Sequence, residues 1–196
     1  MSTLFFKKFI FKGKEISPKT PKDAIELGIG LVPEDRKKEG ALLGMSIRCN
    51  INMPIYQRIS KGTVINEKKE EEIAQTYRKE ISIKTPTLDQ LVKNLSGGNQ
   101  QKVILAKWLA ADSELLIFDE PTRGIDVGAK QESYTLINHL VEQGKTVLMI
   151  SSEMEELKGM SDRILILAEG NMTGELNKSE FNQERIMQLA SIEKGE

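Results

Sequence analysis

The chain has 196 residues and a nearly balanced charge, with 28 Lys and Arg against 29 Asp and Glu and a formal net charge of -1. This length suits one domain with a hydrophobic core, or one incomplete larger domain. The charge balance gives no electrostatic support for a nucleic-acid-binding surface, so we expect no nucleic acid among the partners. The single cysteine, Cys49, excludes an internal disulfide and suits a reducing cytosol.

No segment has the composition of a signal peptide or of a membrane span. Residues 1–12 are rich in Phe, but Lys7 and Lys8 interrupt the apolar run, and no small-residue cleavage site follows. No later stretch approaches eighteen apolar residues. Any membrane role therefore requires a partner.

Short apolar segments separated by turn and helix-start signals make up the first part of the chain. Gly13 marks the turn of a hairpin whose two sides alternate in polarity. Thr20 offers an N-cap, and Pro21 follows it at the first helical position. The predicted elements are a hairpin over residues 8–16, a helix over 21–28, a strand over 29–32 and a solvated polar loop over 34–40.

Residues 46–94 are more polar and predict a small helical subdomain. Ile73, Tyr77 and Ile81 recur every four residues, beside a charged run over 67–72. This spacing places a narrow apolar stripe along one side of a helix.

Three continuous apolar runs after residue 110 predict strands of a parallel sheet. Such runs are typical of strands that helices cover on both faces. Between the first two runs, a predicted helix turns an apolar face away from the only histidine, His139, which we expect to be solvated. A last amphipathic helix is predicted over 179–192. The predicted strands are 115–118, 147–150 and 164–168, and the inward residues are Val127, Tyr134, Ile137 and Val141 in the first helix and Phe181, Ile186 and Leu189 in the last.

Ser96, Gly97 and Gly98 precede a predicted helix over residues 99–111. The glycines let backbone amides approach an anion, and the helix adds its positive amino-terminal end. The Ser96 hydroxyl supplies a further donor. The same residues also suit a plain helix start with Ser96 as N-cap, and both interpretations can hold together. We expect the anion to be a phosphate.

Asp119 and Glu120 follow a predicted strand, at the carboxyl end where open α/β sheets bind ligands. Asp119 would hold Mg²⁺ through water, and Glu120 would orient or deprotonate an attacking water. Two acids after a strand are by themselves a common turn. Residues 121–126 favour the functional interpretation, because they place Asp126 at the start of the next helix.

The sequence contains no G-x-x-x-x-G-K-[ST] phosphate loop. The nearest match ends in Gly144-Lys145-Thr146, but His139 stands five residues before Gly144, where the first glycine is required. The segment also follows a predicted helix instead of a strand. We interpret Gly144 as a helix stop that leads into the next strand.

Four strings resemble ABC-type ATPases, and in particular the second ATP-binding half of fused monosaccharide importers of the ribose, galactose and xylose type. The resemblance covers about residues 16–187, and the string over 119–130 is its most specific part. The strings are VPEDRK at 32–37, NLSGGNQQK at 94–102, DEPTRGIDVGAK at 119–130 and SSEM at 151–154.

The resemblance implies a partial P-loop NTPase fold of the α/β class, with ATP and Mg²⁺ as ligands. In this family the signature motif of one domain closes over the nucleotide that another domain holds. Asp119 would bind Mg²⁺, Glu120 would be catalytic and Asp126 would belong to the D-loop. The signature residues that bind this nucleotide would be Ser96, Gly97, Gly98, Asn99 and Gln100.

Two positions depart from the general ABC pattern. Glu34 replaces the Q-loop glutamine that senses Mg²⁺ and the transmembrane subunit, and Ser152 replaces the switch histidine. The resemblance implies that both departures are typical of the second half of these importers. They predict slow hydrolysis at the site that contains Asp119 and Glu120.

The missing phosphate loop implies a truncated gene product or a fragment, which we expect to be inactive as an ATPase in isolation. Its predicted parts are a core-lobe remnant over 1–45, a helical subdomain over 46–94, and the signature helix, Walker B strand and carboxyl-terminal core over 95–196. The expected partners are transmembrane permease subunits, another ATP-binding domain and, indirectly, a sugar-binding protein. The expected location is peripheral, on the cytoplasmic side of the cell membrane.

Two other hypotheses stay open from the sequence. The chain could be the carboxyl lobe of a DNA-repair or chromosome-type ABC ATPase, in which coiled coils separate the phosphate loop from the signature. The sequence has no heptad run before residue 90 and no basic face to support this. The chain could also be a non-catalytic remnant that binds a permease without nucleotide.

Overall fold

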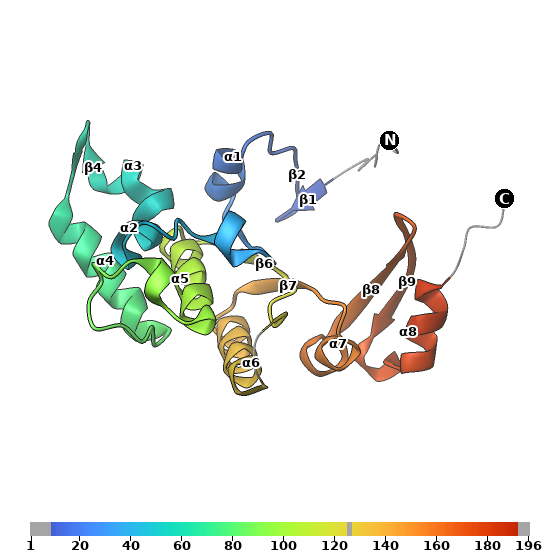
Figure 1. The fold of residues 1–196 in the computed structure, drawn as a ribbon. Coiled ribbons are helices and arrows are strands. Elements are labelled where there is room, and N and C mark those ends of the chain that lie inside the picture. Colours follow the sequence, from blue (N-terminus) through green and yellow to red (C-terminus); the bar gives the residue numbers. More distant parts are fainter. Residues whose placement is uncertain (1–8, 125–126, 192–196) are drawn as a thin grey trace. The chain divides into compact units, whose positions relative to one another are not determined.

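The computed structural model describes residues 9–124 and 127–191, which group into two compact units. The larger unit spans residues 19–150, and the smaller comprises the described parts of 1–18 and 151–196. Figure 1 shows the elements of each unit. Within the described residues, no helix has both the length and the apolar character that a membrane span requires.

The larger unit is built on a three-stranded parallel sheet in the order β3-β6-β7. Its strands are β3 (Ile29–Val32), β6 (Leu115–Asp119) and β7 (Thr146–Ile150). Across the sheet, Leu31 pairs with Ile117, and Ile117 pairs with Leu148. The predicted α/β class and parallel sheet are confirmed, and the carboxyl ends of the three strands lie at one edge.

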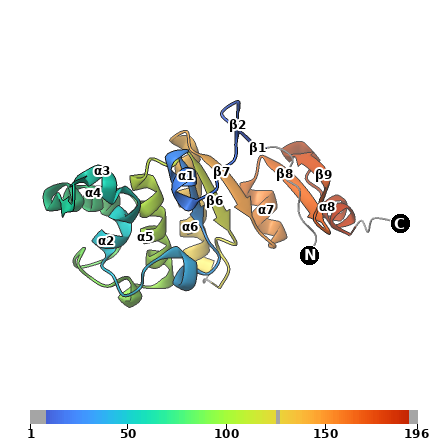
Figure 2. The same cartoon turned by 90° about the horizontal axis from the view of Figure 1, so that it is seen from above.

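Two helices cover one face of this sheet (Figures 1 and 2). α5 (Gly97–Ala110) contacts β3, and α6 (Val127–Glu142) contacts β7. Side chains from the sheet and from both helices form the core. Its buried members include Val32, Leu116 and Phe118 from the sheet, Val103, Ile104, Leu105 and Ala106 from α5, and Ile137 and Leu140 from α6.

The opposite face of the sheet is only partly covered, so the prediction of strands buried on both faces was wrong for this unit. Leu31, Leu148 and Ile150 are 44%, 45% and 49% exposed. These side chains point away from α5 and α6, because successive side chains of a strand alternate between faces. An apolar run permits burial on both faces, but burial also requires elements that cover both.

The predicted inward face of α6 is correct at Ile137 and wrong at Val141. Val141 is exposed, and Leu140 is buried in its place. Tyr134 is half-buried, and the side chain of Val127 lies outside the described part of the structure. His139 is exposed, as predicted, and lies within hydrogen-bond distance of Gln143.

α1 (Pro21–Glu26) begins where the sequence predicts. The Thr20 hydroxyl accepts a hydrogen bond from the Asp23 amide, and the Asp23 carboxylate accepts one from the Thr20 amide. This capping box satisfies two amides that have no partner within the helix. Backbone donors from Lys19 and Thr20 also lower the pKa of Asp23.

The loop over 34–40 was predicted to be solvated, and Glu34, Lys37, Lys38 and Glu39 are exposed. The segment also contains a helical turn, η1 (Arg36–Gly40). Asp35 caps this turn, because its carboxylate accepts hydrogen bonds from the amides of Lys37 and Lys38, each at 3.1 Å. Gly40 is buried at its end. The charge-rich sequence did not indicate that this turn packs against α5.

Short helices and one small hairpin follow in residues 46–94, beside the face of α5 that is away from the sheet (Figures 1 and 2). The prediction of a helical subdomain did not include the hairpin. The elements are α2 (Ile47–Asn52), η2 (Met53–Ile55), α3 (Tyr56–Ile59), β4 (Ser60–Lys61), β5 (Val64–Ile65), α4 (Glu67–Glu80) and η3 (Val92–Asn94).

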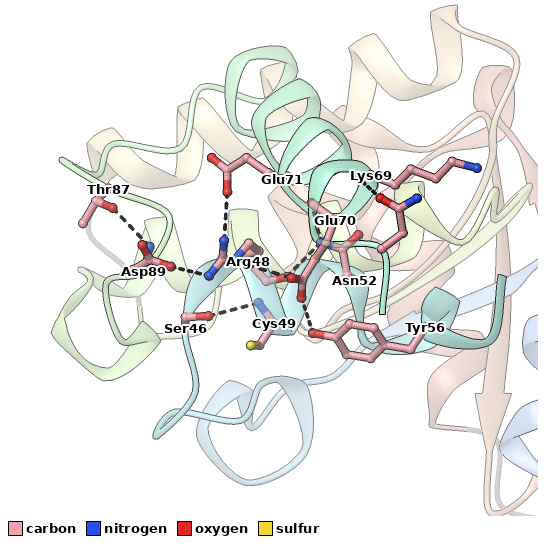
Figure 3. A network of polar contacts seen from close by, with 11 residues as sticks. Ser46, Arg48, Cys49, Asn52, Tyr56, Lys69, Glu70, Glu71, Thr87 and Asp89 are labelled. Carbon is pink, nitrogen blue, oxygen red and sulfur yellow. Dashed lines mark hydrogen bonds and ion pairs between the residues drawn. The ribbon is translucent and has the colours of Figure 1, made fainter. Parts of the chain in front are cut away.

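Arg48 of α2 is the centre of a polar network that joins three segments of this region (Figure 3). Its guanidinium pairs with Glu70 and Glu71 of α4 at 3.7 and 3.2 Å, and with Asp89 at 2.8 Å. The Tyr56 hydroxyl donates to Glu70 at 2.6 Å, and burial raises the pKa of Tyr56. The network fixes α2 against α4 by charge where the apolar stripe is narrow.

The smaller unit contains two antiparallel hairpins. β1 (Phe9–Phe11) and β2 (Lys14–Ile16) pair as predicted. β8 (Arg163–Ala168) pairs with β9 (Asn171–Asn177), so the prediction of a parallel strand over 164–168 was wrong. Glu169 and Gly170, both with positive φ, form the tight turn that joins β8 to β9. The sequence analysis did not predict β9, because polar residues interrupt its apolar pattern.

α7 (Met154–Met160) and α8 (Gln183–Ala190) complete the smaller unit, with the short turn η4 (Lys178–Glu180) before α8. The helix predicted over 179–192 is therefore broken, and Asn182 caps α8 by accepting from the amides of Glu184 and Arg185. Ile186 and Leu189 point inward as predicted, and Phe181 packs against them from the break. The buried cluster is Ile164, Ile166, Leu176, Ile186 and Leu189.

Candidate nucleotide-binding site

The start of α5 presents Ser96 and two glycines at the surface of the larger unit. Ser96 occupies the N-cap position with extended backbone, yet no cap hydrogen bond from its side chain is found in the described structure. Its Oγ instead accepts a hydrogen bond from the Asn99 side chain at 3.0 Å, which leaves the hydroxyl proton for another acceptor. The first amides of α5 and this hydroxyl are therefore donors suited to an anion.

Asn99 and Gln100 hold the segment around this helix start. Asn99 Oδ1 accepts a hydrogen bond from the Lys84 amide at 2.7 Å. Gln100 is buried, and its side-chain amide donates to the carbonyls of Val92 and Leu95. In this structure Gln100 supports the turn before the helix, and the contact of Gln100 with nucleotide stays a prediction.

Asp119 and Glu120 lie together, half-buried, at the carboxyl end of β6. Glu120 has a φ of 47°, which is in the left-handed region that non-glycine residues rarely adopt. Its amide donates to the carbonyl of Ile150 at 2.9 Å, and its carbonyl accepts from the Arg123 amide at 3.1 Å. The backbone of the predicted catalytic residue is therefore tied to β7 and to its own turn.

Glu34 forms an ion pair with Arg123, a partner that the sequence analysis did not predict. Both side chains are exposed. A signal was available, because β3 and β6 are parallel neighbours and opposite charges follow their carboxyl ends. The pair places a positive charge beside Glu34, so this carboxylate does not act as an isolated negative charge.

A second unpredicted connection runs through Gln101 of α5. Its side chain accepts a hydrogen bond from Arg36 at 3.3 Å and donates one to the carbonyl of Pro121 at 2.9 Å. Arg36 also lies beside the start of α5, since a Cβ built on Gly97 would be 3.6 Å from its Nη2. The segments that follow β3 and β6 are thus joined to the signature helix.

Lys107 makes a third unpredicted contact, farther along α5. The side chain is buried, and its ammonium donates to the Gly40 carbonyl at 2.6 Å. Burial lowers the pKa of Lys107 to about 8. Gly40 packs so closely that an added Cβ would lie 2.4 Å from Ile104 Cδ1. This contact holds η1 against the middle of α5.

Two predicted site residues are not located relative to this site. Asp126 lies outside the described residues. Ser152 is exposed in the smaller unit, between β7 and α7. Its neighbour Ser151 donates a hydrogen bond to the buried carboxylate of Glu156.

The site fits a magnesium ion that arrives with a phosphate ligand. No group of three or more His, Cys, Asp or Glu side chains placed for a metal occurs among the described residues. Mg²⁺ in nucleotide sites is usually held by one or two carboxylates, while waters and substrate phosphates complete its shell. Asp119, half-buried at a strand end, suits that role.

Comparison with known proteins agrees with this arrangement. A model of the ABC transporter family matches residues 8–123, which is more than half of the chain. The chain belongs to the ABC transporter family. The match includes Glu34, the signature segment and the two carboxylates at the end of β6.

Relatives of this ABC chain include the xylose import ATP-binding protein XylG of Thermoanaerobacter pseudethanolicus and the ribose import ATP-binding protein RbsA of Clostridium tetani. They are 54% and 51% identical over 179 and 180 residues, which cover 91% and 90% of this chain and 35% of each relative. The chain thus spans about a third of the length of the relatives it matches.

Solved structures share the fold. A nucleotide-free ATP-binding cassette from an ABC transporter aligns with a TM-score of 0.74 and 19% identity, over 94% of this chain and 73% of that one. CbiO1 of Clostridium perfringens aligns with a TM-score of 0.71 and 22% identity, over 91% of this chain and 68% of that one. At these identities the likeness shows the fold alone.

Proposed function

We propose that this chain is the ATP-binding, energy-coupling part of a bacterial ABC importer for a monosaccharide. The observation that carries the proposal is the 54% identity to a xylose import ATP-binding protein across 91% of the chain. The surface-facing donors at the start of α5 and the two acids at the end of β6 support it, because ATP hydrolysis needs both kinds of group.

In this proposal the start of α5 closes over an ATP that another ATP-binding domain holds. The Ser96 hydroxyl and the amides at Gly97 and Gly98 would donate to its γ-phosphate. Asn99 would position the Ser96 hydroxyl through the hydrogen bond described above. Gln100 would act with these donors, and its side-chain amide would hold the carbonyl of Leu95 in the turn before α5.

Asp119 and Glu120 serve a second nucleotide site in the same proposal. Asp119 would hold Mg²⁺ through water, and the ion would neutralise charge on the transferred phosphate. Glu120 would orient the attacking water and accept its proton. Asp126, in the D-loop, would lie near the partner's site.

We propose that this second site is slow. Glu34 and Ser152 replace an amide and an imidazole that would contact the reacting groups, and loss of one positioned donor costs on the order of 3 to 4 kcal/mol of barrier. The ion pair between Glu34 and Arg123 supports this, because it orients the carboxylate toward the turn after β6.

The proposed partners are permease subunits in the cell membrane, a further ATP-binding domain and, through the permease, a sugar-binding protein. The chain would be peripheral, on the cytoplasmic side. We propose that Glu34 and the helical region face the permease. Leu42, Met45 and Met53, which are exposed apolar residues in that stretch, support a protein contact there.

Sugar uptake tests the proposed role of the signature. Ser96→Arg, in a transporter assembled with this chain, should abolish uptake, because the larger side chain occupies the space for the γ-phosphate. Folding should survive, since Ser96 is exposed. Ser179→Arg, at an exposed serine of the smaller unit, is the control. Normal uptake with Ser96→Arg would contradict the importer proposal.

ATPase assays separate the proposal from a remnant without catalysis. The isolated chain should not hydrolyse ATP, whereas the assembly should. In an intact homologue, the change that matches Glu120→Gln should lower the total rate much less than the equivalent change in the other ATP-binding half. Equal losses would overturn the inequality of the two sites. Permease binding that is unaffected by ATP, with no hydrolysis in the assembly, would favour the non-catalytic remnant.

A further inference from the structure

Gln101 is a buried side chain that connects the turn carrying Glu120 to α5 and η1, in addition to the exposed ion pair of Arg123 with Glu34. It lies in the second turn of α5 and is 7% exposed. Its amide group uses both of its functions, since the oxygen accepts from Arg36 at 3.3 Å and the nitrogen donates to the Pro121 carbonyl at 2.9 Å. Buried amides of this kind fix the backbone that they contact, because breaking either bond leaves a polar group without a partner.

The residue directly before Pro121, which Gln101 contacts, has a strained backbone. Glu120 has a φ of 47°, and such conformations persist only where surrounding contacts hold them. On one side, the Glu120 amide donates to Ile150. On the other side, the carbonyl of Pro121, the residue after Glu120, accepts a hydrogen bond from Gln101. The direction of the Glu120 side chain therefore depends on α5 as well as on the sheet.

We infer that Gln101 is a positioning residue for Glu120: it holds the turn that carries Glu120 against α5, and through Arg36 it links that turn to η1. This rests on the proposed role of Glu120 in hydrolysis. Gln101 contacts neither ATP nor water in this role. It keeps the turn over 119–124 in the conformation that aims the carboxylate, and it ties this conformation to the segment that begins at Glu34.

The two halves of the amide can be tested separately. Gln101→Glu keeps an acceptor for Arg36 but loses the donor to Pro121 and sets an oxygen against that carbonyl. Arg36→Met removes only the other contact and leaves Gln101 bound to Pro121. Gln101→Met removes both with little change in volume. The control is Gln131→Met, at an exposed glutamine of α6.

Hydrogen exchange on the full chain measures the structural half of the inference. The amides of Glu120 and Arg123 should exchange about tenfold faster in Gln101→Met and in Gln101→Glu, because local opening becomes easier. Exchange in the interior of β6 should not change, and that result also shows that the variant is folded. Arg36→Met and the control should leave both amides as they are. Unchanged exchange of the two amides in folded Gln101→Met and Gln101→Glu would overturn the inference.

Steady-state ATPase kinetics of the assembled transporter measure the functional half. With the partner domain's catalytic glutamate replaced, so that only this site turns over, Gln101→Met should lower kcat on the order of tenfold and change KM for ATP less than twofold. In a Glu120→Gln background it should lower kcat no further, because it acts through that residue. Additive losses would overturn the positioning role.

The two failures can be told apart. Absence of ATP hydrolysis in every assembly of the unmodified chain would refute the proposed function, while hydrogen exchange would still decide whether Gln101 holds the turn. Hydrolysis that is present and unaffected by Gln101→Met and Gln101→Glu would refute the inference and leave the proposed function intact.

Discussion

The two faces of the sheet β3-β6-β7 have similarly apolar sequences and very different surroundings. On one face, Val32, Leu116 and Phe118 are buried under α5 and α6. On the other, Leu31 and Leu148 are nearly half exposed. A run of apolar residues shows which faces of a strand can be buried, but not which are. Stability within the described chain should therefore come mainly from the covered face.

Removal of a side chain from the covered face should have the largest effect. Phe118 is 2% exposed. Phe118→Ala should reduce the free energy of unfolding by about 3 to 5 kcal/mol, because it leaves a cavity between the sheet and the helices. Urea denaturation followed by circular dichroism measures this. A loss below about 1 kcal/mol would mean that the two faces do not differ as described.

The buried lysine of α5, Lys107, should make the stability of the covered side sensitive to pH. The folded pKa of Lys107 is about 8, below the value of about 10.4 in an unfolded chain. Between these values the unfolded chain binds more protons, so the wild-type chain should gain stability as pH rises.

Relative to Lys107→Met, this gain should reach about 2 kcal/mol between pH 7 and pH 9.5. Denaturation midpoints at a series of pH values would show it. Lys68→Met, at an exposed lysine of α4, should show no such trend. A wild-type curve parallel to that of Lys107→Met would contradict a buried amine with a lowered pKa.

A single added methyl group should also destabilise the covered face of the sheet. A Cβ on Gly30 would lie 2.8 Å from Trp108 Cγ, whose helix covers that face. Gly30→Ala should therefore cost about 1 to 3 kcal/mol through overpacking. Gly159→Ala provides the matched control, because no atom lies within 4 Å of its added Cβ and Gly159 is in a helix. The control should be neutral or slightly stabilising, and equal thermal shifts of the two variants would count against this packing.

Polar substitution on the partly covered face should have the smallest effect. Leu148→Asn and Leu31→Asn should each change the free energy of unfolding of the chain by about 0.5 kcal/mol or less. Differential scanning calorimetry of each variant against the wild type checks this. A loss near that of Phe118→Ala would show that the face is covered in solution.

Local signals in the sequence predicted most of the elements of the larger unit. Such signals involve only a few neighbouring residues, and the structure has a helix or a strand where each one predicts it. Examples are the Thr20 cap, the apolar run over 29–32 and the glycines at the start of α5. The break near Asn182 shows what apolar periodicity alone does not predict. The cap at Asn182 starts a separate helix there, although the apolar pattern continues across the break.

The contacts that build the candidate site were beyond such signals. Gln101 and Pro121 are 20 residues apart, Gly40 and Lys107 are 67 apart, and Glu34 and Arg123 are 89 apart. No periodicity relates such pairs. The placement of α5 against η1 and the turn after β6 brings the first two pairs together, and the parallel pairing of β3 with β6 brings Glu34 near Arg123. The motifs predicted which residues would face a nucleotide, but not which side chains hold those residues in place.

The anchoring of α5 has a mechanical consequence. The Trp108 indole donates to the Leu31 carbonyl at 2.6 Å, near the carboxyl end of the helix. Gly97 begins the same helix eleven residues earlier, about 16 Å away along its axis. A tilt of about 5° around Trp108 would therefore move Gly97 by about 1.4 Å. The contact of Trp108 with Leu31 can therefore serve as a pivot for α5, and a small rotation about it is enlarged at the start of the helix, where we propose that the phosphate binds.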